Sequence, residues 1–201
     1  MVSKEQSGDV ILAGEKVYLG QVRRDLAPVY RRWLNDLQVS RTLGVINYQG
    51  LPLTDEDEFD WFDAVRADKG EAVFGIYERE TGRPVGNGGL SETRLPNRSA
   101  EFGIAIGERD AHGQGYGTEA TRLILDYGFN VLGLHHIWLK CVEFNHAGIR
   151  AYEKAGFQQA GRLREAWQLG GKQYDVLLMD VLARDFESPV VKDLLDIPGD
   201  E

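Results

Sequence analysis

The segment that most constrains how this chain folds is RDAHGQGYGTEA, residues 109–120, in which glycines stand at alternating positions. The residues before it, SAEFGIAIGE, alternate well enough to predict a strand that ends near Gly107. After it, Ala120, Ile124 and Tyr127 recur at steps of three or four residues, which places them on one face of a helix. The first turn of a helix presents unpaired N–H groups and a positive dipole end, and glycines let an anion approach them. The sequence therefore predicts a strand, a loop and a helix that together bind a diphosphate.

Three kinds of diphosphate ligand compete for such a loop. A P-loop ends in Gly-Lys-Ser/Thr, whereas here Gly117 is followed by Thr118 without a lysine. A dinucleotide-binding loop has the spacing G-x-G-x-x-G directly after its strand and an acidic residue about twenty positions later. Here the spacing is G-x-G-x-G, the strand ends too early, and Glu143 lies too far along the chain. The third candidate is the pyrophosphate of coenzyme A.

Residues 112–117, HGQGYG, resemble the cofactor loop of the GNAT superfamily of acetyl-CoA-dependent N-acetyltransferases, whose pattern is Arg/Gln-x-x-Gly-x-Gly/Ala. His112 stands where arginine or glutamine is usual. Residues 145–157, NHAGIRAYEKAGF, resemble the family's Asn-x-x-Ala/Ser-x-x-x-Tyr-x-Lys-x-Gly-Phe run. RRWLNDLQV and DEFDWF resemble the N-terminal helices of the subgroup that acetylates ribosomal-protein N-termini, spermidine and some amino sugars. The resemblance covers residues 16–186.

The fold that this resemblance implies is α+β, of an α/β-like three-layer kind. Its sheet is mixed, mostly antiparallel and twisted, flanked by helices, and splayed between the fourth and fifth strands. We expect an N-terminal tail at 1–15, a single acetyltransferase domain at 16–186 and an acidic C-terminal tail at 187–201. The local signals for helix starts and helix ends are Asp25, Thr54, Asn145, Gly133 and Gly156.

The resemblance also implies that acetyl-CoA is bound by main-chain N–H groups of the loop and by the strand beside the pantetheine arm. The glycines have a plainer reading, which is close packing of the helix start on the sheet. Thr118 could meet a phosphate oxygen or bond its own backbone, and Asn145 could contact the coenzyme arm or simply cap its helix. Arg150 could pair with the phosphates of the adenosine end or lie on a solvated face. The expected cofactor residues are Ile104, Ala105, Ile106, His112, Gly113, Gln114, Gly115, Tyr116, Gly117, Thr118, Asn145 and Arg150.

Two residues are expected to take part in catalysis. In the family, the tyrosine that matches Tyr152 faces the thioester sulfur and is taken as the general acid. A thiol near pKa 8.5 is a stronger acid than a phenol near 10, so handing over that proton costs roughly 2 kcal/mol, and hydrogen bonding to the departing thiolate is the easier role. Glu101, or else Glu92, could deprotonate the amine, although Glu101 could equally be a surface charge at a strand end. The plain reading of Tyr152 is a core tyrosine.

Composition excludes several other classes of function. The 201 residues carry a net charge of −9, which disfavours nucleic acid as a partner. No apolar run is long enough to cross a bilayer, and the first residues do not read as a secretory signal. The single cysteine, Cys141, cannot form an internal disulfide, which favours the cytoplasm. The four histidines and Cys141 show no metal-ligand spacing, so no metal is expected.

These observations predict direct transfer of an acetyl group from acetyl-CoA to a primary amine in a ternary complex. The acceptor would be a small-molecule amine, such as a polyamine, an amino sugar or an aminoglycoside, or else a peptide N-terminus. A homodimer is expected by analogy with the family. The alternatives are a catalytically silent acyl-CoA-binding regulatory module and, more remotely, a dehydrogenase. The aromatic residues expected to wall the acceptor pocket are Tyr48, Trp61, Trp167 and Tyr174.

Overall fold

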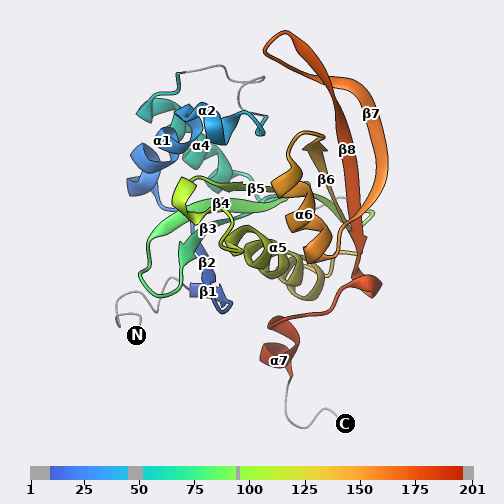
Figure 1. Cartoon of the computed structure of the whole chain (residues 1–201). Helices are drawn as coiled ribbons and strands as arrows, with labels where there is room; N and C mark the ends of the chain where they lie inside the picture. The colour runs from blue at the N-terminus through green and yellow to red at the C-terminus, as the bar shows by residue number, and fades with distance from the viewer. Residues whose placement is uncertain (1–9, 45–51, 94–95, 197–201) are drawn as a thin grey trace.

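A single sheet of eight strands runs through the residues that the computed structural model describes, 10–44, 52–93 and 96–196 (Figure 1). The strand order is β1-β2-β3-β4-β5-β6-β8-β7, and neighbouring strands are antiparallel except β5 and β6. The strands are β1 (Val10–Ala13), β2 (Val17–Gln21), β3 (Ala72–Glu78), β4 (Pro84–Ser91), β5 (Ser99–Ile106), β6 (His136–Val142), β7 (Gln158–Leu169) and β8 (Lys172–Leu182).

The parallel pair β5 and β6 is joined only at its start. Residues 99–101 of β5 lie opposite residues 136–138 of β6, and no further pairing joins these two strands in the described chain. β5 stays paired with β4 as far as Ile106. Because β1 precedes the first strand that the sequence predicts, β5 and β6 are the predicted fourth and fifth strands. The mixed, mostly antiparallel sheet and its predicted splay are therefore confirmed.

Helices cover the sheet on two sides. Figure 1 shows α1 (Ala27–Asn35), α2 (Leu37–Ser40) and α4 (Asp55–Ala67) on one side of β3, β4 and β5, with α5 (Tyr116–Asp126) on the other. The last helix of this layer, α6 (His146–Ala155), packs against α5. Side chains alternate along β3, so Phe74 packs on Tyr127 just beyond α5, whereas Tyr77 stacks on Tyr18 on the opposite face. The result is the expected three-layer arrangement.

The helix boundaries follow the local signals with one exception. Thr54 and Asp57 form a reciprocal capping box at the start of α4, as the acidic first turn predicts. Asp25 does not cap a helix, because α1 begins at Ala27 after a short 3-10 turn. The Asp25 carboxylate instead bonds the Arg23 guanidinium at 2.6 Å. Pro28 at the helix start needs no side-chain acceptor, since proline has no N–H to satisfy.

Ordered structure extends past both ends of the expected domain. β1 lies within residues 1–15, and α7 (Val191–Leu195) lies beyond residue 186. Asp126, fully buried at the end of α5, holds that C-terminal segment by accepting the main-chain N–H groups of Val190 and Val191 at 2.9 and 2.8 Å. In the described part of the chain, no helix is both long and apolar enough to span a membrane.

Candidate active site

The glycine loop has an open, left-handed backbone. Gly113 and Gly115 have φ angles of 76° and 85°, a region that favours glycine. A Cβ on Gly113 would meet no described atom within 4 Å, and one on Gly117 would meet only Ile106, at 3.5 Å. Close packing of the helix start against the sheet therefore does not explain these glycines. Successive N–H groups in such a backbone form a concavity that suits an anion, and Gly115 is the N-cap of α5.

Two side chains of the loop bond to the sheet. The Nε2 atom of His112 lies 2.8 Å from the carbonyl oxygen of Ile106 at the end of β5. A carbonyl only accepts, so this nitrogen carries the proton. The hydroxyl of Tyr116 donates to the Glu78 carboxylate at 2.7 Å. The His112 ring thus anchors the loop to the end of the strand, and the loop is fixed by the protein's own groups.

The loop is also tied to α1 through the residue after β5. Trp33 lies directly over Gly107, where a Cβ would come within 2.0 Å of the indole ring. The indole N–H of Trp33 donates to the Glu108 carboxylate at 2.9 Å, and Arg32 bonds the same oxygen. Burial opposes ionisation of Glu108, but these two hydrogen bonds lower its pKa below the ordinary value. A cavity of about 440 Å³ opens beside this contact between α1 and the loop.

A third tie joins the N-terminal hairpin to α5. Glu119, in the first turn of α5, accepts the main-chain N–H groups of Glu15, Lys16 and Val17, each at 2.8 Å. The Nζ atom of Lys16 donates to the carbonyl oxygen of Gln114 at 2.9 Å. Sequence reasoning missed both contacts, because they join residues about a hundred positions apart. The one available signal was an acidic residue in the first turn of a helix expected to bind an anion.

Beyond the loop, β5 presents a free edge toward β6. Residues 102–106 are bonded to β4 on one side and to no strand on the other within the described chain. In an antiparallel pair, alternate residues direct their N–H and C=O groups to the outer edge. Ile104, Ala105 and Ile106 lie on this stretch and are half-buried. The edge can therefore pair with an extended amide-containing chain.

Tyr152 of α6 lies where β5 and β6 part. Its ring packs edge-on against Phe102, the first residue of β5 beyond the pairing, and against Phe157, with centroid distances of 6.0 Å in both cases. Burial, and to a lesser extent the nearby Cys141 thiol, raises the pKa of Tyr152 well above its ordinary value. The phenol is therefore protonated throughout the neutral and moderately alkaline range, and it is a hydrogen-bond donor.

Asn145 is a helix cap in this structure. Its Oδ1 atom accepts the Gly148 N–H at 3.0 Å at the start of α6. Burial raises the pKa of the Cys141 thiol to about 11, and a hydrogen bond with Asn145 counteracts part of that effect. Cys141 is thus a protonated, buried thiol. The oxygen of the Asn145 amide therefore serves the helix.

Glu101 has a cationic neighbour. Its carboxylate pairs with the Lys140 ammonium at 3.3 Å, and that ammonium also lies 5.0 Å from the centre of the Trp138 ring. The side chains of Arg150 and Thr118 make no hydrogen bond or ion pair with the described residues, and Arg150 is exposed. The side chains of Arg150 and Thr118 are thus available to a ligand.

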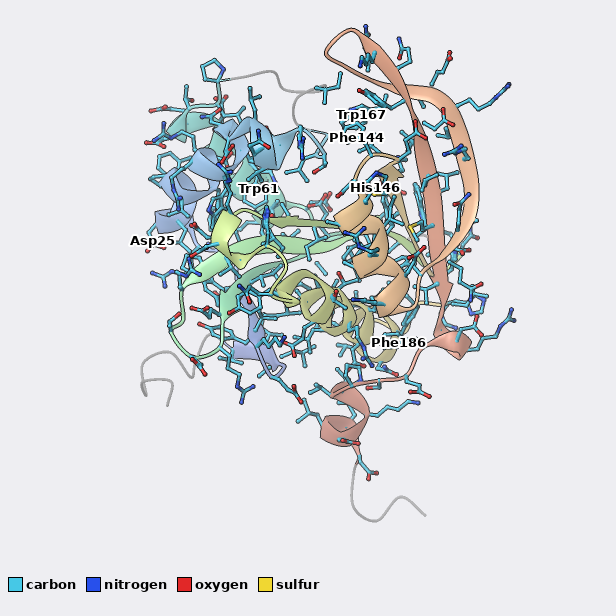
Figure 2. All side chains as sticks on the ribbon, viewed as in Figure 1. Asp25, Trp61, Phe144, His146, Trp167 and Phe186 are labelled. Atoms are coloured by element: carbon cyan, nitrogen blue, oxygen red, sulfur yellow. The ribbon has the colours of Figure 1, made fainter. Side chains whose placement is uncertain are left out.

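The expected acceptor walls are only partly brought together. Phe144 packs edge-on against Tyr174 at 4.7 Å, and Trp167 lies opposite Tyr174 across the β7–β8 hairpin. Figure 2 shows Trp167 and Phe144 close together beside the hairpin, above His146 of α6. Trp61 instead packs against Tyr30 within the helix layer, at 5.9 Å. Tyr48 falls outside the described residues.

The indole N–H of Trp167 is buried and has no hydrogen-bond partner in the described chain. Among the same residues, no group of three or more His, Cys, Asp or Glu side chains is arranged to hold a metal ion.

Comparison with known proteins gives a consistent picture. A family model described as "Acetyltransferase (GNAT) domain" matches residues 16–158. An uncharacterized N-acetyltransferase, p20 of Bacillus licheniformis, is 26% identical over 176 residues, which cover 86% of this chain and 96% of that protein. The spermidine N(1)-acetyltransferase of Vibrio cholerae is 36% identical over 93 residues, 46% of this chain and 53% of that protein.

Solved structures agree in fold. The spermidine N-acetyltransferase of Vibrio cholerae, in complex with CoA and spermine, superimposes with a TM-score of 0.74 at 24% identity, covering 86% of this chain and 98% of that one. A GNAT-family acetyltransferase from Bacillus anthracis gives a TM-score of 0.73 at 20% identity, with 86% and 98% coverage. Since the family model spans more than half of the sequence, the chain belongs to the GNAT family of acetyltransferases, as its glycine loop first suggested.

Proposed function

We propose that this protein transfers an acetyl group from acetyl-CoA to a primary amine in a ternary complex. The observation that carries the proposal is the free edge of β5, which has the open glycine loop at its far end and Tyr152 at its opening. These three features lie in the order that a diphosphate, an amide-containing arm and a thioester would require.

The loop and the strand edge would hold the coenzyme. Main-chain N–H groups at Gly113, Gly115 and Gly117, with the start of α5, suit the diphosphate. The free edge at residues 104–106 suits the amides of the pantetheine arm, and Asn145 would contribute through its amide nitrogen. Arg150 and Thr118 would reach phosphate oxygens. The coenzyme supplies the acetyl group as an activated thioester.

Positioning would contribute most of the rate. Two reactants held in line can gain several orders of magnitude from proximity alone. A main-chain N–H on the free edge of β5 would polarise the thioester carbonyl. The Tyr152 hydroxyl would donate a hydrogen bond to the sulfur as the carbon–sulfur bond breaks and the carbon–nitrogen bond forms. Its raised pKa supports a donor rather than an acid that gives up its proton.

Glu101 is the proposed base. A side-chain-like amine is neutral in roughly one molecule in 2,500 at pH 7, whereas an α-amine is neutral in roughly one in seven. A polyamine acceptor therefore needs a base far more than a peptide N-terminus does. The ion pair with Lys140 keeps the Glu101 carboxylate close to the opening, and proton transfer could be direct or through water.

Two observations bear on the chemical class of the acceptor amine. Relatives named spermidine N(1)-acetyltransferase support a polyamine. The indole N–H of Trp167 is buried without a partner among the described residues, which supports an acceptor that carries an oxygen, such as a peptide or an amino sugar. The proposal also includes a cytoplasmic location and a homodimer, the latter testable by sedimentation.

A thiol-release assay tests the proposal directly. Purified protein and acetyl-CoA are screened against spermidine, aminoglycosides, amino sugars and N-terminal peptides, with calorimetry of acetyl-CoA and NAD in parallel. We expect acetyl-CoA binding and amine-dependent thiol release. Binding without release for any acceptor would support the silent acyl-CoA-binding module instead, and binding of NAD alone would overturn both.

A further inference from the structure

The turn between β1 and β2 is fixed beside the glycine loop. Its main-chain N–H groups at Glu15, Lys16 and Val17 bond the Glu119 carboxylate. From the other side, Arg79 donates to the carbonyl oxygens of Gly14 and Lys16. Gly14 is needed here, because a Cβ would come within 2.6 Å of the Glu119 carboxyl carbon. The turn therefore has one position relative to α5, and Lys16 occupies a defined place in it.

The side chain of Lys16 reaches the glycine loop. Its ammonium donates to the Gln114 carbonyl at 2.9 Å, and it would lie 3.2 Å from a Cβ on Gly115. In the described part of the chain, no carboxylate lies within ion-pair distance of it, although the chain as a whole is acidic. An ammonium has three donors, so two of them are left over. A cation without a carboxylate partner at an anion-binding loop points to an anionic ligand.

The first position of the glycine loop, residue 112, offers no side-chain cation to such a ligand. The family pattern has arginine or glutamine where this chain has His112, and the His112 ring bonds the Ile106 carbonyl. Lys16 comes from a different part of the chain and brings a full charge to the same loop. A charge-assisted hydrogen bond from an ammonium to a phosphate oxygen is stronger than one between neutral groups.

We propose that Lys16 is a cofactor-binding residue that contacts the diphosphate of coenzyme A from outside the glycine loop, so that the N-terminal β1–β2 turn forms part of the cofactor site. This inference rests on the proposed function, because it takes the loop as the diphosphate site. Its consequence is that coenzyme affinity depends on a residue far from the loop in sequence, held there by Glu119.

The test is the Lys16→Met variant, which keeps the side-chain length and the main-chain bonds of residue 16. Lys69→Met is the matched control, because the Lys69 ammonium is likewise exposed and bonds a main-chain carbonyl, that of Arg66 at 3.3 Å. Calorimetry measures the Kd of CoA and of 3′-dephospho-CoA at low and high salt, and ligand-detected NMR measures pantetheine. We expect K16M to weaken both CoA and 3′-dephospho-CoA by about three- to tenfold, as for an exposed charged hydrogen bond. Pantetheine binding should not change, and the salt dependence of CoA binding should become shallower.

Each other outcome overturns the inference in a recognisable way. Equal losses for all three ligands would make Lys16 merely structural. A loss for CoA that vanishes with 3′-dephospho-CoA would assign Lys16 to the 3′-phosphate instead. Identical affinities of K16M and K69M would remove any role in binding. If the unaltered protein bound CoA in none of these experiments, the proposed function itself would fall, which distinguishes that failure from the failure of Lys16.

Discussion

The ring of Tyr152 packs edge to face against the ring of Phe102, with centroids 6.0 Å apart and planes inclined at 81°. Phe102 is the residue at which β5 leaves β6. The position of the Tyr152 hydroxyl is therefore set by apolar packing of α6 on the strand that opens, because the phenol makes no hydrogen bond with the described residues. A reaction placed at this opening can use that hydroxyl without first breaking an internal contact.

Removing the hydroxyl alone should affect chemistry and not binding. Tyr152→Phe retains the ring and its packing, so we expect unchanged thermal stability and a Kd for acetyl-CoA within about twofold of the original. The kcat should fall by about 10² to 10³, as when one oxyanion-type donor is lost. Steady-state kinetics and calorimetry measure the two effects, with Tyr127→Phe as the control for loss of a phenol elsewhere. A variant with full kcat would leave Tyr152 as a packing residue only.

Glu101→Gln should show its effect mainly where the amine is protonated. With a polyamine acceptor, kcat/KM should drop by about 10² at pH 7 and by much less near pH 10, because the amine is then largely neutral without help. The raised pKa of Tyr152 predicts no loss of activity from tyrosine ionisation up to about pH 10. The pH profiles of the original protein and the variant measure this, and Glu92→Gln tests the other candidate base in the same way. A flat profile from pH 6 to 9 in the original protein would rule out the base role.

Loss of the Glu119 carboxylate should lower both the stability of the protein and its affinity for the coenzyme. Glu119→Ala leaves three main-chain N–H groups without their acceptor, two of which are exposed and can turn to water. We expect a loss of about 1 to 2 kcal/mol in the free energy of unfolding, with weaker CoA binding as the turn that carries Lys16 loosens. Urea unfolding and calorimetry measure both quantities. Glu153→Ala, on the exposed face of α6, controls for loss of a helix carboxylate, and equal behaviour of the two variants would contradict the anchoring role.

The features that sequence predicts well here are those fixed by neighbouring residues. The Thr54 capping box, the cap at Asn145 and the left-handed helix ends at Gly133 and Gly156 each depend on a few adjacent positions. Asp25 fails as a cap because a residue two positions earlier, Arg23, offers its carboxylate a stronger partner.

The contacts that sequence could not predict are those that only the topology creates. Lys16 meets Gln114, and Trp33 meets Gly107, because β1–β2 and α1 happen to pack beside the same loop. Composition and periodicity carry no information on which turn faces which loop. The splay could be named only through resemblance to a family, since no local pattern says where two parallel strands part.

The stability of the protein should depend on pH through Glu58. This carboxyl lies on α4 and is only 3% exposed, and burial, with the charges of Asp57 and Asp55, raises its pKa from 4.5 to about 7. Between these two values the folded protein holds a proton that the unfolded chain releases, so stability falls as the pH rises through this range, and the whole penalty is present above pH 7. Glu58→Gln carries no such penalty, so the difference in free energy of unfolding between the variant and the original protein should grow in favour of the variant by about 2.5 kcal/mol from pH 5 to pH 8. Urea unfolding at the two pH values measures the gain, and Glu56→Gln, on the exposed side of the same helix, should show none. Parallel pH curves for E58Q and the original protein would mean that the Glu58 carboxyl titrates normally and is solvated in the folded state.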